Sequence, residues 1–299
     1  SLSRENLFKI SFYFFFISLF FLFLVPILGT EVKGSKRWLN LFFLPRFQPI
    51  ELVKPFIIIF IATILCSEKN FNIYFKYLLT FIAIVPACLL LMMQPDIGQT
   101  LLIFLAWAVL VFISGISLPV ILTFFSFSLL SLVYMVFFIQ KFAYIKNRIL
   151  SFFNPSDGTH NFQSDKAIDA ISSGGFFGKG IGEGTLKNNV PEAHTDYIIS
   201  VISEEFGVVA IVLLLILFLF FIYTVFQKIY LEKSEKIKLV LTGTICLIIF
   251  QALIHIGVNI RLFPTTGMTL PFLSYGGSSI VGVSILSGII LNLTKRQID

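Results

Sequence analysis

Charged residues are scarce in this chain of 299 residues, of which only 13% are Asp, Glu, Lys or Arg. A soluble domain usually carries about 25% of these residues. The apolar fraction is 57%, and the mean hydropathy is +0.94. This balance excludes an ordinary soluble domain and indicates a polytopic membrane protein.

Cysteine is also rare. The three cysteines, Cys66, Cys88 and Cys246, all fall in apolar segments and show no metal-binding or disulfide spacing, so we expect buried small hydrophobic residues. The net charge is +6, but no basic run alternates with aromatic residues, and Lys and Arg stand in short loops between apolar runs. The sequence therefore predicts no nucleic-acid partner.

A nucleotide-binding loop is missing as well. The glycine-rich stretch SSGGFFGKGIGEGTLK, residues 172–187, lacks the Gly-Lys-Ser/Thr that follows a strand in a P-loop. We therefore expect no nucleotide and no organic cofactor. The stretch fits a mobile or re-entrant segment over the membrane surface better.

Long apolar runs fill most of the chain. Prolines and glycines separate them, as expected for breaks between helices. We predict an all-α, polytopic integral membrane helical bundle that forms a single domain over residues 1–299, with a long loop at 142–196. A window of about 19 residues places the spans near residues 10–28, 52–67, 77–93, 97–114, 118–139, 197–227, 238–257 and 272–293.

The distribution of Lys and Arg predicts the sidedness of the bundle. By the positive-inside rule, we expect both ends of the chain on the cytoplasmic side. Three irregular segments, at 29–50, 142–196 and 258–278, then share the outer face, which makes the 142–196 loop extracytoplasmic. These segments hold most of the unusual polar residues.

Ionisable residues crowd the entrance of the sixth span, in the sequence PEAHTDYIISVISEE. Asp196 is either a structural carboxylate favoured by a helix dipole, or a base or cation ligand that faces a polar cavity. We expect Thr195 to cap a helix that begins at Asp196. Zinc binding by His194 with Asp196 or Glu192 has only weak support, because no partner motif accompanies them.

The first outer segment and the second span contain a second group of charges. Glu51 and Lys54 stand at i and i+3, so they share one helix face and can simply pair with each other. Alternatively, Lys54 joins Lys36 and Arg37 in binding an anionic lipid headgroup such as a pyrophosphate. The residues alone leave both interpretations open.

Two further stretches combine polar residues with helix breakers. In QPDIGQT, Asp96 follows Pro95 between two spans, where a role as helix N-cap explains it adequately. In NIRLFPTTGMTLPFLSYGGSSIVG, prolines and glycines interrupt an apolar region, which is tolerated at membrane depth only inside protein or along a polar cavity. Residues 274–279 can cap the last helix, whose amides could face an anion; a purely structural loop is the alternative.

These stretches, in this order, resemble the SEDS (shape, elongation, division and sporulation) family of bacterial membrane proteins. The resemblance covers the whole chain, and its long motifs look more like the division branch than the elongation branch. The motifs are KGSKRW, FQPIELVK, QPDIGQT, NPSDGTHNFQSDKAI, GGFFGKGIGEGTLKNNVPEAHTDYIISVISEEFG and PTTGMTLPFLSYGGSS.

The resemblance implies a peptidoglycan glycosyltransferase that polymerises lipid II, a disaccharide-pentapeptide carried on undecaprenyl pyrophosphate. It would work in septal cell-wall synthesis at the outer face of the bacterial cytoplasmic (inner) membrane. Asp196 matches the family's essential carboxylate, which acts as general base with inversion at the anomeric carbon. A divalent cation, Mg²⁺ or Mn²⁺, would assist the pyrophosphate. The implied partners are a class B penicillin-binding transpeptidase and other membrane proteins of the division machinery.

Family members have ten spans, and the KGSKRW loop follows the third, so we expect this chain to lack the first two. A lipid II flippase and a non-catalytic scaffold remain alternatives. The flippase is motivated by the broken helix at 258–278 and by Glu51, Lys54 and Glu204 within the spans. The expected substrate-binding residues are Lys36, Arg37, Glu51, Lys54, Gln94, Asp96, Gln163, Lys187, Glu192, His194, Thr195, Ser274, Tyr275, Gly276, Gly277 and Ser278.

Overall fold

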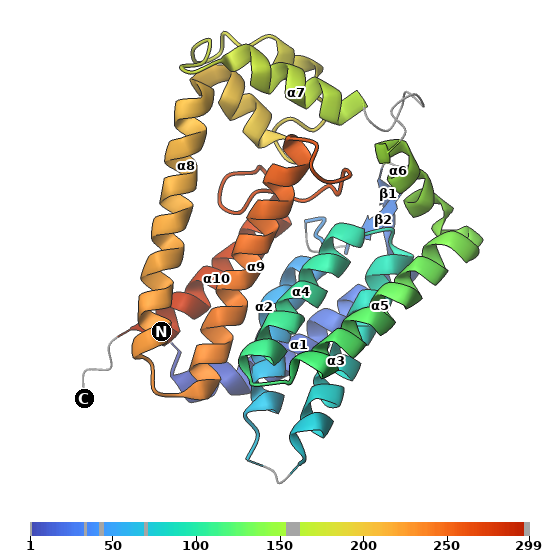
Figure 1. Cartoon of the computed structure of the whole chain (residues 1–299), viewed down its shortest axis with the longest axis vertical. Coiled ribbons are helices and arrows are strands. Elements are labelled where there is room, and N and C mark those ends of the chain that lie inside the picture. Colours follow the sequence, from blue (N-terminus) through green and yellow to red (C-terminus); the bar gives the residue numbers. More distant parts are fainter. Residues whose placement is uncertain (1, 33–34, 42–44, 69–70, 154–161, 296–299) are drawn as a thin grey trace. The chain divides into compact units, whose positions relative to one another are not determined.

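The computed structural model describes residues 2–32, 35–41, 45–68, 71–153 and 162–295 (Figure 1). Contacts divide the chain into two compact units: unit 1 comprises residues 1–128, 224–249 and 277–299, and unit 2 comprises residues 129–223 and 250–276. In chain order, the elements are α1 (Arg4–Leu28), β1 (Thr30–Val32), β2 (Ser35–Trp38), α2 (Ile50–Leu65), α3 (Ile73–Met93), α4 (Ile97–Ile113), α5 (Leu118–Phe138), the 3₁₀ helix η1 (Gln140–Phe142), α6 (Ala143–Phe153), α7 (Phe162–Gly174), η2 (Leu186–Asn189), α8 (Ile198–Leu231), α9 (Glu235–Asn259) and α10 (Gly277–Thr294).

Each of the eight predicted apolar runs forms a helix. Six of these helices, α1, α3, α5, α8, α9 and α10, are long and apolar enough to cross a membrane. The other two are shorter, with 17 residues in α4 and 16 in α2. The all-α fold of a multi-pass membrane protein is therefore confirmed. The single-domain organisation and the sidedness stay predictions.

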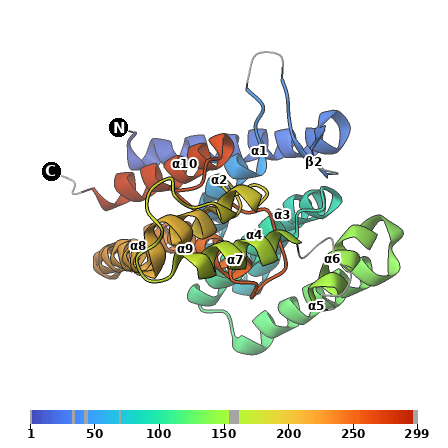
Figure 2. The same ribbon diagram turned by 90° about the horizontal axis from the view of Figure 1, so that it is seen from above.

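Helix α2 is the centre of unit 1. It packs against α1, α3, α4 and α10 (Figures 1 and 2), as expected for a helix that is apolar on nearly every side. Pro55 has no N–H and leaves the Glu51 carbonyl without its usual partner within the helix. Gly282 of α10 lies at this point, where a Cβ would approach the Glu51 carbonyl oxygen to 2.8 Å.

Other helices expose their apolar surface. In α5 the only buried residue among those described is Val136, and 6% of the most apolar window of α8 is buried. A soluble monomer rarely exposes apolar surface on this scale. In a membrane protein, lipid covers such faces.

The predicted loop at 142–196 contains regular structure. Helices α6 and α7 and the 3₁₀ helix η2 lie within it, so the expectation of an irregular segment is wrong for these residues. Small residues line the buried face of α7 and allow close packing. They are Ser164, Ala167, Ala170 and Gly174. The NPSDGTHN part of the quoted motif, at 154–161, lies outside the described residues.

Helix α8 is broken at Gly207, which has φ 75° and ψ −176°. Figure 1 shows the chain turning sharply within α8. We call residues 198–206, before Gly207, the first arm and residues 208–231, after it, the second arm. The glycine-rich segment 174–187 supplies hydrogen bonds that the helix loses at the break. The N–H groups of Lys179 and Gly180 donate to the carbonyl oxygens of Glu204 and Glu205 (2.9 and 3.0 Å), and those of Val208 and Val209 donate to Gly175 and Phe176 (3.0 and 3.2 Å).

Candidate functional site

A tight turn before α8 carries Asp196. The N–H groups of Thr195 and Asp196 both donate to the carbonyl oxygen of Glu192, at 3.0 Å each. Glu192 has φ 56°, in the left-handed region that non-glycine residues adopt infrequently. This left-handed conformation of Glu192 allows the chain to form the tight turn.

The predicted helix start is wrong. Helix α8 begins at Ile198, not at Asp196, and the Thr195 hydroxyl donates to the carbonyl (3.2 Å) and carboxylate (3.1 Å) oxygens of Glu192 instead of capping the helix. The turn therefore precedes the helix and does not form its first residues. This leaves its carbonyl groups available to partners elsewhere in unit 2.

Three consecutive carbonyl groups of the turn accept hydrogen bonds from residues far along the chain. All three donors lie in unit 2, at the end of α9 or in the segment before α10. The backbone around Asp196 is therefore held from outside the turn, which fixes its position. The bonds run from the Tyr275 N–H to His194 (2.9 Å), from the Ser274 hydroxyl to Thr195 (2.6 Å) and from the Asn259 amide to Asp196 (3.1 Å).

The side chains of the turn differ in exposure. Asp196 is half-buried, whereas His194 and Tyr275 are exposed and their rings lie edge to face with centroids 5.9 Å apart. Tyr197 is buried beneath the turn, and its hydroxyl lies 3.3 Å from that of Ser164 on α7. Burial raises the pKa of Tyr197 to about 12, so this hydroxyl stays protonated at neutral pH.

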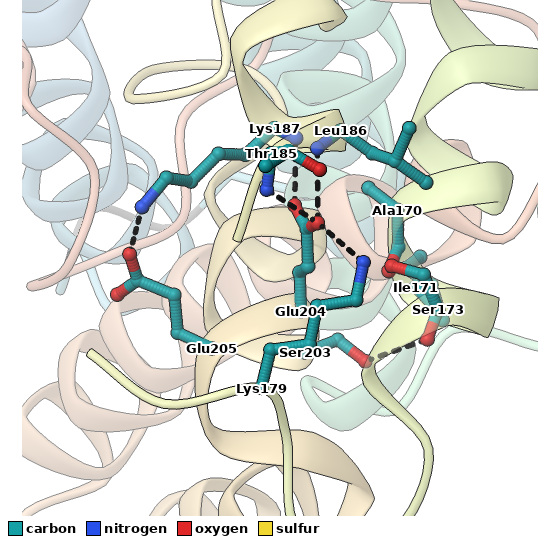
Figure 3. A network of polar contacts seen from close by, with 10 residues as sticks. All are labelled: Ala170, Ile171, Ser173, Lys179, Thr185, Leu186, Lys187, Ser203, Glu204 and Glu205. Atoms are coloured by element: carbon teal, nitrogen blue, oxygen red, sulfur yellow. Dashed lines mark hydrogen bonds and ion pairs between the residues drawn. The ribbon is translucent and has the colours of Figure 1, made fainter. Parts of the chain in front are cut away.

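Glu204 ties the glycine-rich segment to the first arm of α8 (Figure 3). Its side chain is fully buried and accepts four hydrogen bonds, which compensate for burying the charge. They come from the N–H groups of Thr185 (3.0 Å), Leu186 (2.9 Å) and Lys187 (2.6 Å) and from the Lys179 ammonium (3.2 Å). Glu204 is thus a structural carboxylate that holds the chain leading into the Asp196 turn.

The neighbouring Glu205 also binds this segment. It pairs with the Lys187 ammonium (Figure 3). It also accepts the Gly182 N–H at 3.1 Å. Lys187, expected to bind substrate, is therefore engaged within the protein.

In unit 1, the Arg37 guanidinium is bound to the QPD motif. It donates to the carbonyl oxygens of Gln94 (3.1 Å) and Pro95, and lies 3.6 Å from the Asp96 carboxylate. Asp96 caps α4 by accepting the Gln99 N–H at 3.3 Å, so the capping interpretation is confirmed. The Gln48 amide also donates to Asp96, at 3.4 Å.

Glu51 and Lys54 form a buried ion pair. The ammonium nitrogen lies 2.7 Å from the carboxylate, and the side chains are only 3% and 1% exposed. The Gln99 amide donates to the second carboxylate oxygen at 3.0 Å. Of the two interpretations of this i,i+3 pair, mutual pairing is the one that the structure shows.

The remaining predicted residues divide between the two units. In unit 1, Lys36 is exposed opposite Glu31 in the hairpin, and the Ser278 hydroxyl accepts the Gln48 N–H at 3.0 Å. Gly277 begins α10. In unit 2, Gln163 lies on α7 and Gly276 ends the segment that holds the turn. The substrate-binding roles of all these residues stay predictions.

Sequence reasoning missed Asn259, Gln99 and the ion pair between Arg261 and Asp165 (2.6 Å). Asn259 and Gln99 are polar residues in otherwise apolar helices, a signal that could have flagged both. The Asp165 pairing gives no such signal, because its partner lies 96 positions away.

A metal site formed by protein ligands alone does not occur among the residues that the structure describes. No three His, Cys, Asp or Glu side chains gather closely enough to hold an ion. Among the described residues, His194, Asp196 and Glu192 are therefore not part of a three-ligand cluster that would support zinc binding.

Comparison with known proteins shows which family this chain matches. Residues 1–298 match the FtsW, RodA and SpoVE family, described as "Cell cycle protein". A Caulobacter vibrioides relative, named "Probable peptidoglycan glycosyltransferase FtsW", is 33% identical over 99% of this chain and 75% of its own length. A Haemophilus influenzae relative of the same name is 32% identical over 95% of this chain and 73% of its own.

Two solved structures are similar over nearly the whole chain. The first, from work titled "Structural coordination of polymerization and crosslinking by a peptidoglycan synthase complex", has a TM-score of 0.81 at 29% identity and covers 100% of this chain and 84% of its own. The rod shape determining protein RodA of Thermus thermophilus has a TM-score of 0.68 at 29% identity, over 98% of this chain and 79% of its own.

Proposed function

Because the chain belongs to the FtsW, RodA and SpoVE family and is a peptidoglycan glycosyltransferase, we propose that it polymerises lipid II with Asp196 as general base. One observation carries the assignment of the base. Asp196 is half-buried in a turn whose backbone is held by Tyr275, Ser274 and Asn259. This combination gives a carboxylate a fixed position while part of it stays accessible.

The reaction needs one proton acceptor. Asp196 takes the proton of the acceptor sugar hydroxyl as the hydroxyl oxygen attacks the anomeric carbon of the donor sugar. The bond from that carbon to the pyrophosphate oxygen breaks, the configuration inverts, and undecaprenyl pyrophosphate leaves with the electron pair. A positioned general base contributes about 10²–10⁴-fold to the rate of such a step.

We propose that a divalent cation, Mg²⁺ or Mn²⁺, binds together with the pyrophosphate of the substrate. The described residues offer no three-ligand cluster, but Mg²⁺ bound with phosphate oxygens takes only one or two protein carboxylates. Asp196 is compatible with such a role. When bound, the ion would neutralise charge on the leaving pyrophosphate.

The proposal includes a partner and a location. The similar structure whose title names a peptidoglycan synthase complex supports a class B penicillin-binding transpeptidase as partner. Since the relatives carry the name FtsW, the division septum of the inner membrane, with other division proteins, is the proposed place of action.

The test is lipid II polymerisation by the full natural chain with its transpeptidase, comparing wild type, Asp196→Asn and Asp169→Asn. Asp169 is the matched control, because it lies on α7 of the same unit and makes only an exposed pair with Lys166. We expect Asp196→Asn to lower glycan synthesis by about 10²–10⁴-fold and Asp169→Asn to retain it. Equal product from all three proteins would show that the base lies elsewhere. Translocation of lipid II in vesicles without glycan product would favour the flippase.

A further inference from the structure

Three large apolar side chains stand exposed at the tip of the glycine-rich segment. Phe176, Phe177 and Ile181 are 75%, 84% and 79% exposed. We call residues 176–181 the aromatic tip. Its only charged residue, Lys179, is paired with the buried Glu204. The exposed surface of the tip is therefore mostly apolar, although the Lys179 side chain is 35% exposed.

Backbone hydrogen bonds hold the tip in place. Its backbone pairs with both sides of the break in α8 through the four hydrogen bonds at Glu204, Glu205, Val208 and Val209. Gly178, with φ 77°, allows this approach, because a Cβ there would overlap the Glu205 carbonyl group. The exposed side chains are thus held at a fixed place beside the first residues of the second arm.

The length and composition of the second arm place a boundary of the hydrocarbon region there. The run from Val208 to Phe226 contains no charged residue, and at 1.5 Å per residue about 19 residues rise about 28 Å. The hydrocarbon core of a bilayer is about 30 Å thick. Glu204 and Glu205 lie four and three positions before Val208, so we place the lipid boundary close to Val208, where the tip is attached.

We propose that the aromatic tip inserts into the bilayer interface as a second, non-spanning membrane contact of unit 2. Exposed Phe side chains favour the boundary between headgroups and acyl chains. The tip is continuous with the exposed start of the second arm, where Val208, Val209 and Val212 are 43%, 42% and 47% exposed. Lipid is the occupant that covers this neighbouring surface. The inference does not rest on the glycosyltransferase proposal.

The test places a fluorescent probe at the tip. F177W and I181W variants of the full natural chain are reconstituted in phosphatidylcholine and phosphatidylglycerol vesicles, with or without bromine on the acyl chains near the headgroups. The emission of the parent chain, which contains Trp38 and Trp107, is subtracted. The control is K233W, because Lys233 is exposed in the turn between α8 and α9.

For a tip in the interface, we expect brominated lipid to lower the added emission of F177W and I181W by about twofold, with little change for K233W. Emission that is insensitive to brominated lipid but quenched by aqueous iodide would overturn the proposal. Shielding from iodide that arises only when the transpeptidase is added would also overturn it and assign the tip to a protein partner. The two variants place the probe at separate sites, so misfolding of one leaves the other informative.

Discussion

In unit 1, the buried charges are bound to neighbours, such as Lys54 to Glu51 and Arg37 to the QPD motif. Unit 2 also contains such a charge, Glu204, but around Asp196 polar groups hold a backbone turn while the Asp196 side chain itself is half-buried. In the sequence, both regions offered a functional and a structural interpretation, because each places charge within apolar surroundings. The comparison teaches that a charge inside a membrane helix can be structural. The held backbone and the partly accessible side chain of Asp196 are the observations on which its proposed role as base rests.

The largest expected effect on stability is in unit 1. Lys54→Met leaves the Glu51 carboxylate buried without its cation, and breaking such a pair from one side costs about 3–5 kcal/mol. We expect this loss in the free energy of unfolding measured by denaturant titration in detergent. The double variant Glu51→Gln/Lys54→Met should recover most of it, since neither of the two positions then carries a buried charge.

A matched control is Lys238→Met, which removes another i,i+3 pair whose Glu235 side chain is 76% exposed. It should change stability by about 0.5 kcal/mol or less. If Lys54→Met were no more damaging than Lys238→Met, the pairing would not stabilise unit 1.

The next effect is at Glu204 in unit 2. Glu204→Gln removes the charge that three N–H groups and Lys179 share, and a hydrogen bond to a charged group contributes about 1.5–3 kcal/mol. We expect a loss of about 2 kcal/mol in unfolding free energy and about a tenfold slower glycan synthesis, because the Asp196 turn moves. Glu205→Gln is the control: its side chain is partly exposed and accepts one backbone N–H, so a smaller loss is expected. Equal losses of stability and of glycan synthesis in the two variants would show that Glu204 does not hold the turn more strongly than Glu205 does.

A smaller effect is expected at Ser274. Its hydroxyl donates to Thr195 and accepts the Leu270 N–H at 2.8 Å, so Ser274→Ala should cost about 1 kcal/mol. The rate of glycan synthesis should fall with it, since one of three supports of the turn is lost. Ser287→Ala removes only a hydroxyl bond within α10 and should leave the rate unchanged. Unchanged kinetics in both variants would contradict the proposed support.

The smallest effect belongs to Arg261. Its pair with Asp165 is 2.6 Å long, but the side chains are 28% and 49% exposed. Exposed pairs contribute about 0–1 kcal/mol, so Arg261→Ala should destabilise the protein by no more than that. The difference should vanish at high salt, because ions screen exposed charges. A loss that persists in high salt would show a packing role instead.

The sequence predicted the features that depend on near neighbours. The apolar runs became helices, Asp96 capped α4, and the spacing of Glu51 and Lys54 indicated their pairing. Each follows from contacts within about four positions. The break at Gly207 was not predicted, because apolar residues continue past it and a single glycine is compatible with a helix.

The supports of the Asp196 turn were beyond local reasoning. The bonds from Asn259 and Ser274 join residues 63 and 79 positions apart. Ser274 was expected among the residues that can cap the last helix, whereas its hydroxyl donates to the Thr195 carbonyl oxygen. Such contacts depend on how the chain folds back on itself, which no residue pattern in the segment encodes.

The four bonds to Glu204 also restrict how this protein can vary in length. Three of them join residues 185–187 to residue 204, so the chain between these residues closes a ring that contains the Asp196 turn. One inserted or deleted residue in that ring would displace the carboxylate relative to its supports. The exposed turn between α8 and α9 closes no such ring, and its length can change at little cost. Within the ring, insertions and deletions are therefore less tolerable than substitutions.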